Sequence, residues 1–149
     1  MNSNRCGSEP AVAQAGARLV ICYHYPCHDR AFAALAAHLH FKSTGGGPRF
    51  VPNRVYTPCM VGDLQLQGDE TVYLLDYAGP SGFAAAVARA VPSGRVFLLD
   101  HHKSTAEQLH GVPVPINLHI TLDQSRSGVV IALEHFQPQE SHHEHAPAS

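Results

Sequence analysis

Asp100, His101 and His102 stand in a row directly after the mainly apolar run 95–99 (RVFLL). The run has the composition of a buried β-strand, and an open α/β sheet places its chemistry in the crevice beyond the carboxyl ends of such strands. One carboxylate and two imidazoles are ligand types that suit a divalent metal ion such as Mn²⁺. The tripeptide and its position after a strand therefore predict a metal site.

A second acidic strand end precedes the first one in the chain. The segment 71–75 (TVYLL) runs into Asp76, so that YLLDY and FLLDH are near copies of one another. A helix predicted over 80–91 joins the two strands into a βαβ unit, in which neighbouring strands lie about 5 Å apart. Asp76 and Asp100 are thus expected side by side, close enough to serve one metal ion or a close pair of ions.

A third strand is predicted over 17–25 (ARLVICYHY), which is rich in β-branched and aromatic residues, and His24 and Asp29 lie at or just beyond its end. Pro26 prevents His24 and His28 from forming an i,i+4 pair on a helix, so this segment must turn from strand to helix. Taken singly, His24 fits an ordinary strand-end histidine and Asp29 fits a helix N-cap. Beside two further acidic strand ends, both are candidate metal ligands.

In this order the motifs resemble those of the DHH phosphoesterase superfamily. The resemblance covers residues 17–136 and is carried by YHYPCHD before an alanine-rich helix, Asp76, the Asp-His-His tripeptide, and Arg126-Ser127-Gly128 before another helix. The first motif, H-x-x-C-x-D, is similar to that of the branch with Cys at this position. The resemblance implies hydrolysis of phosphoric anhydride or phosphodiester bonds with two divalent ions, Mn²⁺ or Mg²⁺. Substrates in the superfamily include pyrophosphate, single-stranded DNA, short RNA and cyclic dinucleotides.

The resemblance also implies a role for each matching residue. One implied metal ion has the ligands His24 and Asp76, and the other has the ligands Asp29, Asp76 and His101. Asp76 would bridge the two ions, His102 would face the substrate phosphate, and Asp100 would fix an imidazole through a hydrogen bond. Two ions about 3.5–4 Å apart clamp the attacking and leaving oxygens of the reaction and activate a bound water.

Three features depart from the family pattern. Cys27 replaces an aspartate, and a thiolate is a softer ligand than manganese prefers. Arg30 replaces a glycine that allows close backbone approach, so its charge would contact phosphate or crowd the site. The chain also stops before the fourth acidic motif and the substrate domain, and Asp123 fits a helix cap near Ser127 better than a replacement ligand. We therefore expect weak or undetectable hydrolysis. The alternative, that the chain is a catalytically silent module that binds metal, a phosphorylated ligand or a partner, stays open.

The charge of the chain restricts its partners. The net charge is −2 with neutral histidine, and no basic stripe is present. Binding to long nucleic acid depends on clustered cations, so a small phosphorylated substrate or a short oligonucleotide is the predicted partner. The residues expected to meet phosphate are Arg30, Lys103, Arg126, Ser127 and Gly128, the last two through backbone N–H groups at a helix start. Solvated surface charge and an ordinary helix cap are the alternatives.

Strands that alternate with helices predict an α/β fold with a mainly parallel open sheet and helices on both faces. Further elements are expected over 31–41 (helix), 49–56 (weaker strand), after Pro115 (short edge strand) and over 129–136 (helix). The length of 149 residues suits one domain. Its expected bounds are 17–136, between a disordered leader over 1–16 and a disordered histidine-rich tail over 137–149.

The sequence predicts neither a membrane span nor a secretory signal, because it has no run of 18 apolar residues and no charged-then-apolar start. The Ala, Ser and Arg content of the leader is compatible with an organelle transit peptide, but Glu9 and the shortage of arginine argue against one, and we expect a cytoplasmic protein. The four cysteines form no C-x-x-C pair, which indicates reduced thiols.

Overall fold

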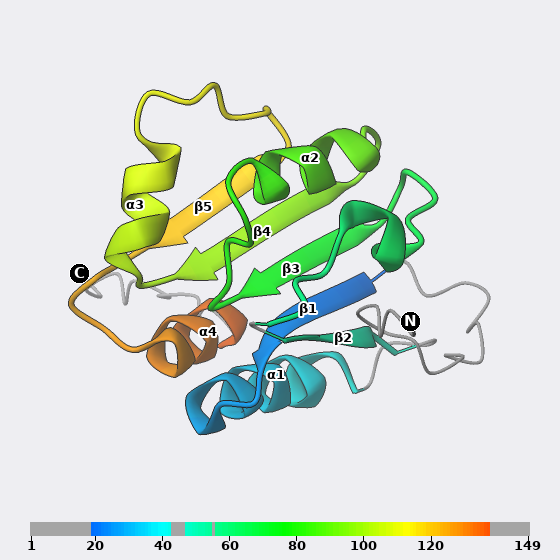
Figure 1. Ribbon diagram of the computed structural model, residues 1–149. Coiled ribbons are helices and arrows are strands. Elements are labelled where there is room, and N and C mark those ends of the chain that lie inside the picture. Colours follow the sequence, from blue (N-terminus) through cyan, green and yellow to red (C-terminus); the bar gives the residue numbers. More distant parts are fainter. Residues whose placement is uncertain (1–18, 43–46, 55, 138–149) are drawn as a thin grey trace, which may run out of the picture.

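Five parallel strands form one open sheet in the computed structural model, which describes residues 19–42, 47–54 and 56–137 (Figure 1). The strands are β1 (Leu19–Tyr25), β2 (Arg49–Arg54), β3 (Thr71–Leu75), β4 (Arg95–Asp100) and β5 (Leu118–Leu122). Their order in the sheet is β2-β1-β3-β4-β5, and every neighbouring pair is parallel. The predicted α/β fold with an open parallel sheet is confirmed. The predicted leader and all but the first residue of the predicted tail lie outside the described residues.

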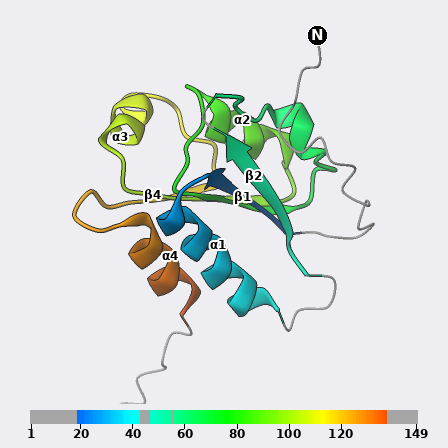
Figure 2. The same ribbon diagram turned by 60° about the horizontal axis from the view of Figure 1, so that its bottom comes forward.

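Helices cover both faces of the sheet, as the sequence predicts. Figure 2 shows α1 (His28–Phe41) and α4 (Gly128–Phe136) on one face, and α2 (Phe83–Ala90) and α3 (Lys103–Leu109) on the other. A short 3₁₀ helix, η1 (Val61–Leu64), packs beside α2. No helix in the described part of the chain is long and apolar enough to cross a membrane.

Each face of the sheet has its own hydrophobic core, because successive side chains of a strand point to opposite faces. On β3, Val72 and Leu74 belong to the core beneath α2, whereas Tyr73 and Leu75 belong to the core beneath α1 and α4. Buried alanines on α1 let this helix lie close to the sheet; they are Ala33, Ala34, Ala36 and Ala37. The apolar runs that predicted the strands are therefore buried on both sides.

Several element bounds differ from the predictions. The first helix begins at His28 with Cys27 as its N-cap, so the alternative that Asp29 caps the helix is wrong. The strand predicted over 49–56 ends at Arg54. Helix α3 was not predicted, because Thr105 is its one buried residue and seven residues with so little burial show no helical periodicity.

The strand order reverses at β1, because the chain leaves β1 through α1 to reach β2 on one side and then crosses to β3 on the other. In open α/β sheets, ligands bind in the crevice at such a switch point, beyond the carboxyl ends of the strands. Tyr23 of β1, Leu75 of β3 and Leu99 of β4 are aligned in register. The residues one step further along the three strands are His24, Asp76 and Asp100, so the fold aligns these three candidate residues across the switch point.

Candidate metal and phosphate site

Asp76 lies directly after β3 in a left-handed backbone conformation, with φ of 55°. Aspartate is one of the few residues besides glycine that adopt this conformation readily. Its N–H donates to the carbonyl oxygen of Leu99 at 2.7 Å, which extends the pairing of β3 with β4 by one residue. The chain then turns away from the sheet, and the Asp76 carboxylate remains buried at the sheet edge.

The start of α4 packs directly against this carboxylate. A Cβ atom added to Gly128 would lie 2.6 Å from Oδ1 of Asp76 and 2.7 Å from its Cγ. Only glycine allows this approach, which brings the positive end of the helix dipole towards the carboxylate. Gly128, predicted to bind phosphate, is thus buried against Asp76.

Asp100 is fully buried and accepts four hydrogen bonds. Its Oδ1 accepts from the backbone N–H groups of His101 (2.7 Å) and His102 (3.2 Å) and from Nδ1 of His102 (2.6 Å), and its Oδ2 accepts from Oγ1 of Thr105 (2.5 Å). Burial alone would raise the pKa of Asp100, but the hydrogen bonds from Thr105, His102 and His101 outweigh it and hold the pKa below the ordinary value. The carboxylate is therefore charged, and with its hydrogen bonds satisfied it orients its neighbours.

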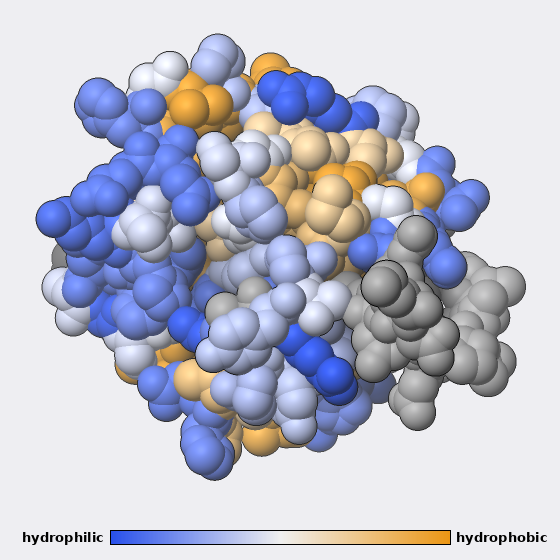
Figure 3. Space-filling view, viewed as in Figure 1, coloured by the Kyte–Doolittle hydropathy of each residue, from blue (hydrophilic) through white to orange (hydrophobic). Residues whose placement is uncertain are grey.

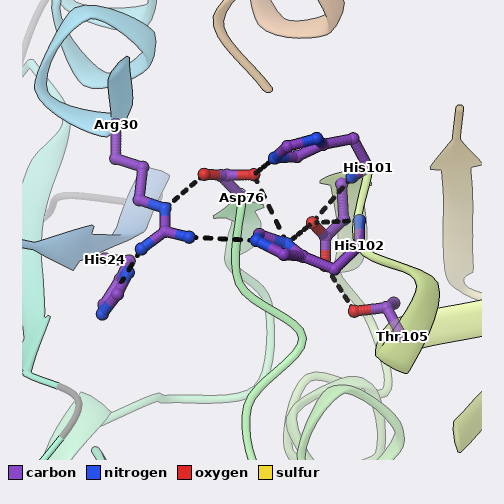
Figure 4. Close-up of polar contacts among 7 residues, drawn as sticks. His24, Arg30, Asp76, His101, His102 and Thr105 are labelled. Carbon is purple, nitrogen blue, oxygen red and sulfur yellow. Dashed lines mark hydrogen bonds and ion pairs between the residues drawn. The ribbon is translucent and has the colours of Figure 1, made fainter. Parts of the chain in front are cut away.

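The hydrogen bond to Asp100 also determines which ring nitrogen of His102 carries a proton. With Nδ1–H donating to Asp100, the neutral ring presents a lone pair at Nε2. Nη2 of Arg30 lies 3.0 Å from this Nε2, and an arginine N–H can only donate (Figure 4). His102 is thus assigned as the Nδ1–H tautomer, with Nε2 as the acceptor.

Arg30 reaches from the first turn of α1 into the centre of the site (Figure 4). Its Nε forms an ion pair with Oδ2 of Asp76, and its Nη1 lies 3.5 Å from Nε2 of His24. Together with the contact to His102, the guanidinium meets residues from three strand ends. The side chain is 16% exposed.

The arrangement around Asp76 fits a metal ion. Oδ1 of Asp76 is buried and accepts no hydrogen bond, while Nε2 of His101 lies 3.0 Å from it. Neighbouring ligands of an octahedral ion with bonds of about 2.0–2.1 Å lie about 3 Å apart. Burial raises the pKa of Asp76, and Arg30 and the two imidazoles offset only part of that effect, so a further cation would stabilise the carboxylate.

The described residues contain one group of side chains able to hold a metal ion, formed by Asp76, Asp100, His101 and His102. One ligand atom from each lies within 4.8 Å of the others. Since Asp100 is saturated and both ring nitrogens of His102 are in contact with partners, Asp76 and His101 are the available ligands. Phosphate oxygens or water would complete the coordination, as is common for Mg²⁺-type sites.

Two predicted metal ligands lie outside this group. Asp29 is exposed in the first turn of α1. His24 lies in the site but faces Arg30, and its ring stacks on Tyr77 at a centroid distance of 6.1 Å. The structure therefore does not assemble the ligand set that the family resemblance implies for two ions.

The other predicted phosphate contacts are engaged elsewhere. The Lys103 side chain is 79% exposed and pairs with Glu107, and Arg126 pairs with Asp123 and Glu134. Hydrogen bonds from Ser125 and Arg126 lower the pKa of Asp123 to about 2. Ser127 is the N-cap residue of α4, so the prediction that Asp123 caps this helix is wrong. Asp123 instead orders the turn before the helix through its hydrogen bonds with Ser125 and Arg126.

A cleft of about 360 Å³ opens beside the site. Its polar wall is formed by His24, Arg30, Asp76, Asp100 and His102, and its other lining residues are Pro58, Tyr77, Ala78, Gly79, Pro80, Ser104, Thr105 and Gln108. Hydrophilic residues dominate the surface over α3, whereas more hydrophobic residues lie over α2 (Figure 3). The volume suits a small ligand. Thr105 and Gln108 were not predicted from the sequence. A helix predicted to start after His102 would have placed both of them near the site.

No protein-family model, curated protein or solved structure gives a significant match to this chain.

Replacing Gly128 with Ala should destabilise the protein, although alanine is normally favoured over glycine in a helix by about 0.5–1 kcal/mol. The added methyl group would overlap the Asp76 carboxylate, and such overpacking costs about 1–3 kcal/mol. Urea unfolding measures the change. Gly62→Ala is the matched control, because a Cβ at Gly62 has no atom within 4 Å. Equal stability of the two variants would contradict the close packing of α4 on Asp76.

Proposed function

We propose that this chain is a DHH-like, metal-dependent phosphoesterase domain that hydrolyses a phosphoric anhydride or phosphodiester bond in a small phosphorylated substrate. The observation that carries the proposal is the juxtaposition at the switch point of an unsatisfied carboxylate oxygen on Asp76, the Nε2 atom of His101 and the Arg30 guanidinium. The Arg30 guanidinium and a metal ion held by Asp76 and His101 would neutralise phosphate oxygens, and the cleft lined by Arg30 and Asp76 suits a small ligand.

Asp76 and His101 would hold the metal ion, which would polarise the phosphate and lower the pKa of a coordinated water. Arg30 presents N–H donors in a planar fork that matches phosphate oxygens. When those donors turn to a phosphate group, Nε2 of His102 becomes available to accept a proton from the attacking water. Asp100 keeps the ring in the required tautomer through its hydrogen bond to Nδ1.

A second candidate is a catalytically silent module that binds metal and a phosphorylated ligand without turnover. Two observations favour it: Arg30 pairs with Oδ2 of Asp76, and Asp29 is exposed outside the metal group. A single metal ion and an arginine together can neutralise the charge of a phosphate group, which is enough for binding. Only one metal ion is then present to activate water for hydrolysis.

Assays with pyrophosphate, short oligonucleotides and cyclic dinucleotides, each with and without Mn²⁺, test both candidates. We expect Mn²⁺-dependent binding of at least one substrate, with weak hydrolysis. Any turnover should fall by at least about 100-fold in His102→Gln, because general-base catalysis typically contributes that much. Binding without detectable turnover would favour the silent module. Absence of both binding and hydrolysis in the presence of Mn²⁺ would contradict the proposed function.

A further inference from the structure

We propose that Arg30 acts as a built-in cation on one side of the Asp76 carboxylate, so that the site takes one divalent metal ion and not two. This inference rests on the proposed function, since it concerns the same metal site. It assigns to Arg30 the control of how many ions bind.

The two oxygens of Asp76 differ in their surroundings. Oδ2 forms an ion pair with Nε of Arg30, whereas the buried Oδ1 accepts no hydrogen bond. The positive charge of an arginine is permanent at any ordinary pH. One side of the carboxylate is therefore neutralised by the chain itself, and the other side is left for an ion.

Arg30 also engages the other side chains on its side of Asp76. Its Nη1 lies 3.5 Å from Nε2 of His24, and its Nη2 lies 3.0 Å from Nε2 of His102. An ion placed between His24 and Oδ2 of Asp76 would have to displace the guanidinium and separate it from an anionic partner that is 3% exposed. Breaking such a buried pair is unfavourable, and a divalent ion beside the remaining positive charge would be repelled.

On the opposite side of Asp76, the described neighbours of Oδ1 are the two imidazoles and Gly128, and none of them carries a permanent positive charge. Nε2 of His101 lies 3.0 Å from Oδ1 of Asp76, and the His101 side chain is 33% exposed. Nε2 of His101 can therefore bind an ion that enters from solvent. The two sides of one carboxylate therefore hold two cations of different kinds. The arginine can stabilise charge on phosphate but cannot supply a hydroxide, whereas a metal ion can do both.

Titration of the folded 149-residue protein with Mn²⁺, with free Mn²⁺ followed by electron paramagnetic resonance, counts the bound ions. The number of ions bound by Asp76→Asn is subtracted from the number bound by each other protein, so that any ion held by the histidines near the C-terminus is not counted. We expect one Asp76-dependent ion in the wild type. In Arg30→Gln, which removes the charge but keeps much of the side-chain volume, we expect two ions with dipolar or exchange broadening of the Mn²⁺ signal.

Lys103→Gln is the matched control, because it removes one positive charge beside the Asp-His-His segment but leaves the Asp76 ion pair intact. It should still bind one ion. A second ion in this control as well as in Arg30→Gln would show that net charge controls the count, and would overturn the inference.

Two Asp76-dependent ions in the wild type would overturn the role of Arg30 while leaving the proposed metal site standing, and this outcome needs no variant of Arg30 to fold. One ion in Arg30→Gln would also overturn it, and Arg30→Gly provides the same test if the glutamine variant does not fold. No Asp76-dependent ion in the wild type would remove the metal site, and with it the proposed function and this inference.

Discussion

Mn²⁺ at a hundredfold excess over its dissociation constant should raise the melting temperature of this protein by about 5–11 °C. A ligand that binds only the folded state adds about 2.7 kcal/mol at that excess, and each kcal/mol corresponds to about 2–4 °C for a chain of this size. In Asp76→Asn the increase should be absent, because the amide has no negative charge for the ion. Calorimetry with and without Mn²⁺ measures both values.

Without metal ions, the same substitution should raise the melting temperature above that of the wild type. Burial raises the pKa of Asp76, so the folded state favours the uncharged carboxyl group. The contribution of this group to stability is full below the ordinary aspartate pKa of about 3.9 and is lost as the pH rises through the folded-state value. At neutral pH, Asp76→Asn should therefore melt above the metal-free wild type, and asparagine also accepts the left-handed backbone at this position.

Two results would contradict this account of Asp76. The first is an equal response of wild type and Asp76→Asn to Mn²⁺, which would place the bound ion elsewhere. The second is a metal-free Asp76→Asn variant that melts well below the wild type, which would show that the ion pair with Arg30 outweighs the cost of burying the carboxylate.

Replacing Asp100 with Ala should lower the free energy of unfolding by about 3–5 kcal/mol, because several donors lose their acceptor and each buried donor left unsatisfied costs about 1–3 kcal/mol. Four donors lose their acceptor: two backbone N–H groups, the His102 ring and the Thr105 hydroxyl. The start of α3 and the tautomer of His102 depend on these bonds. Urea unfolding at neutral pH measures the loss, and nuclear magnetic resonance of the imidazole nitrogens reports the tautomer.

Asp100→Asn is the matched variant. Its amide oxygen can still accept from the backbone N–H groups, so the loss of stability should be smaller. Hydrogen bonds lower the pKa of Asp100, so its contribution is present above the ordinary pKa of about 3.9 and is lost as the pH falls through the folded-state value. The difference between wild type and Asp100→Ala should thus shrink in acid. A difference that is small at neutral pH would contradict the structural role of Asp100.

Much of the fold could be predicted from local patterns in the sequence. Two mainly apolar runs of five residues, each followed by an aspartate, predicted β3 and β4, because a strand buried on both faces is apolar over most of its length. Parallel strands joined by helices place their carboxyl ends at one edge, which was enough to predict that Asp76, Asp100 and His101 lie together. The structure bears this out, with His101 and Asp76 3.0 Å apart.

The helix bounds illustrate where local patterns fail. Asp29 was a candidate ligand because it follows a strand, but α1 begins one residue before it, and its place in the first turn leaves its side chain exposed. Helix α3 has a single buried residue and hence no apolar periodicity to predict it. Its first turn nevertheless supplies Thr105, whose hydroxyl completes the hydrogen bonding of Asp100.

The sequence by itself determined which residues form the strands and that acidic and histidine side chains gather at their carboxyl ends, because both follow from hydrophobic burial and strand direction. Only the tertiary structure decided that Arg30 points at Asp76 and that Gly128 lies against the same carboxylate. These contacts join residues 46 and 52 positions apart, respectively, in the chain. They depend on how α1 and α4 pack on the sheet, since a long flexible side chain and a glycine have no local pattern that specifies a distant partner.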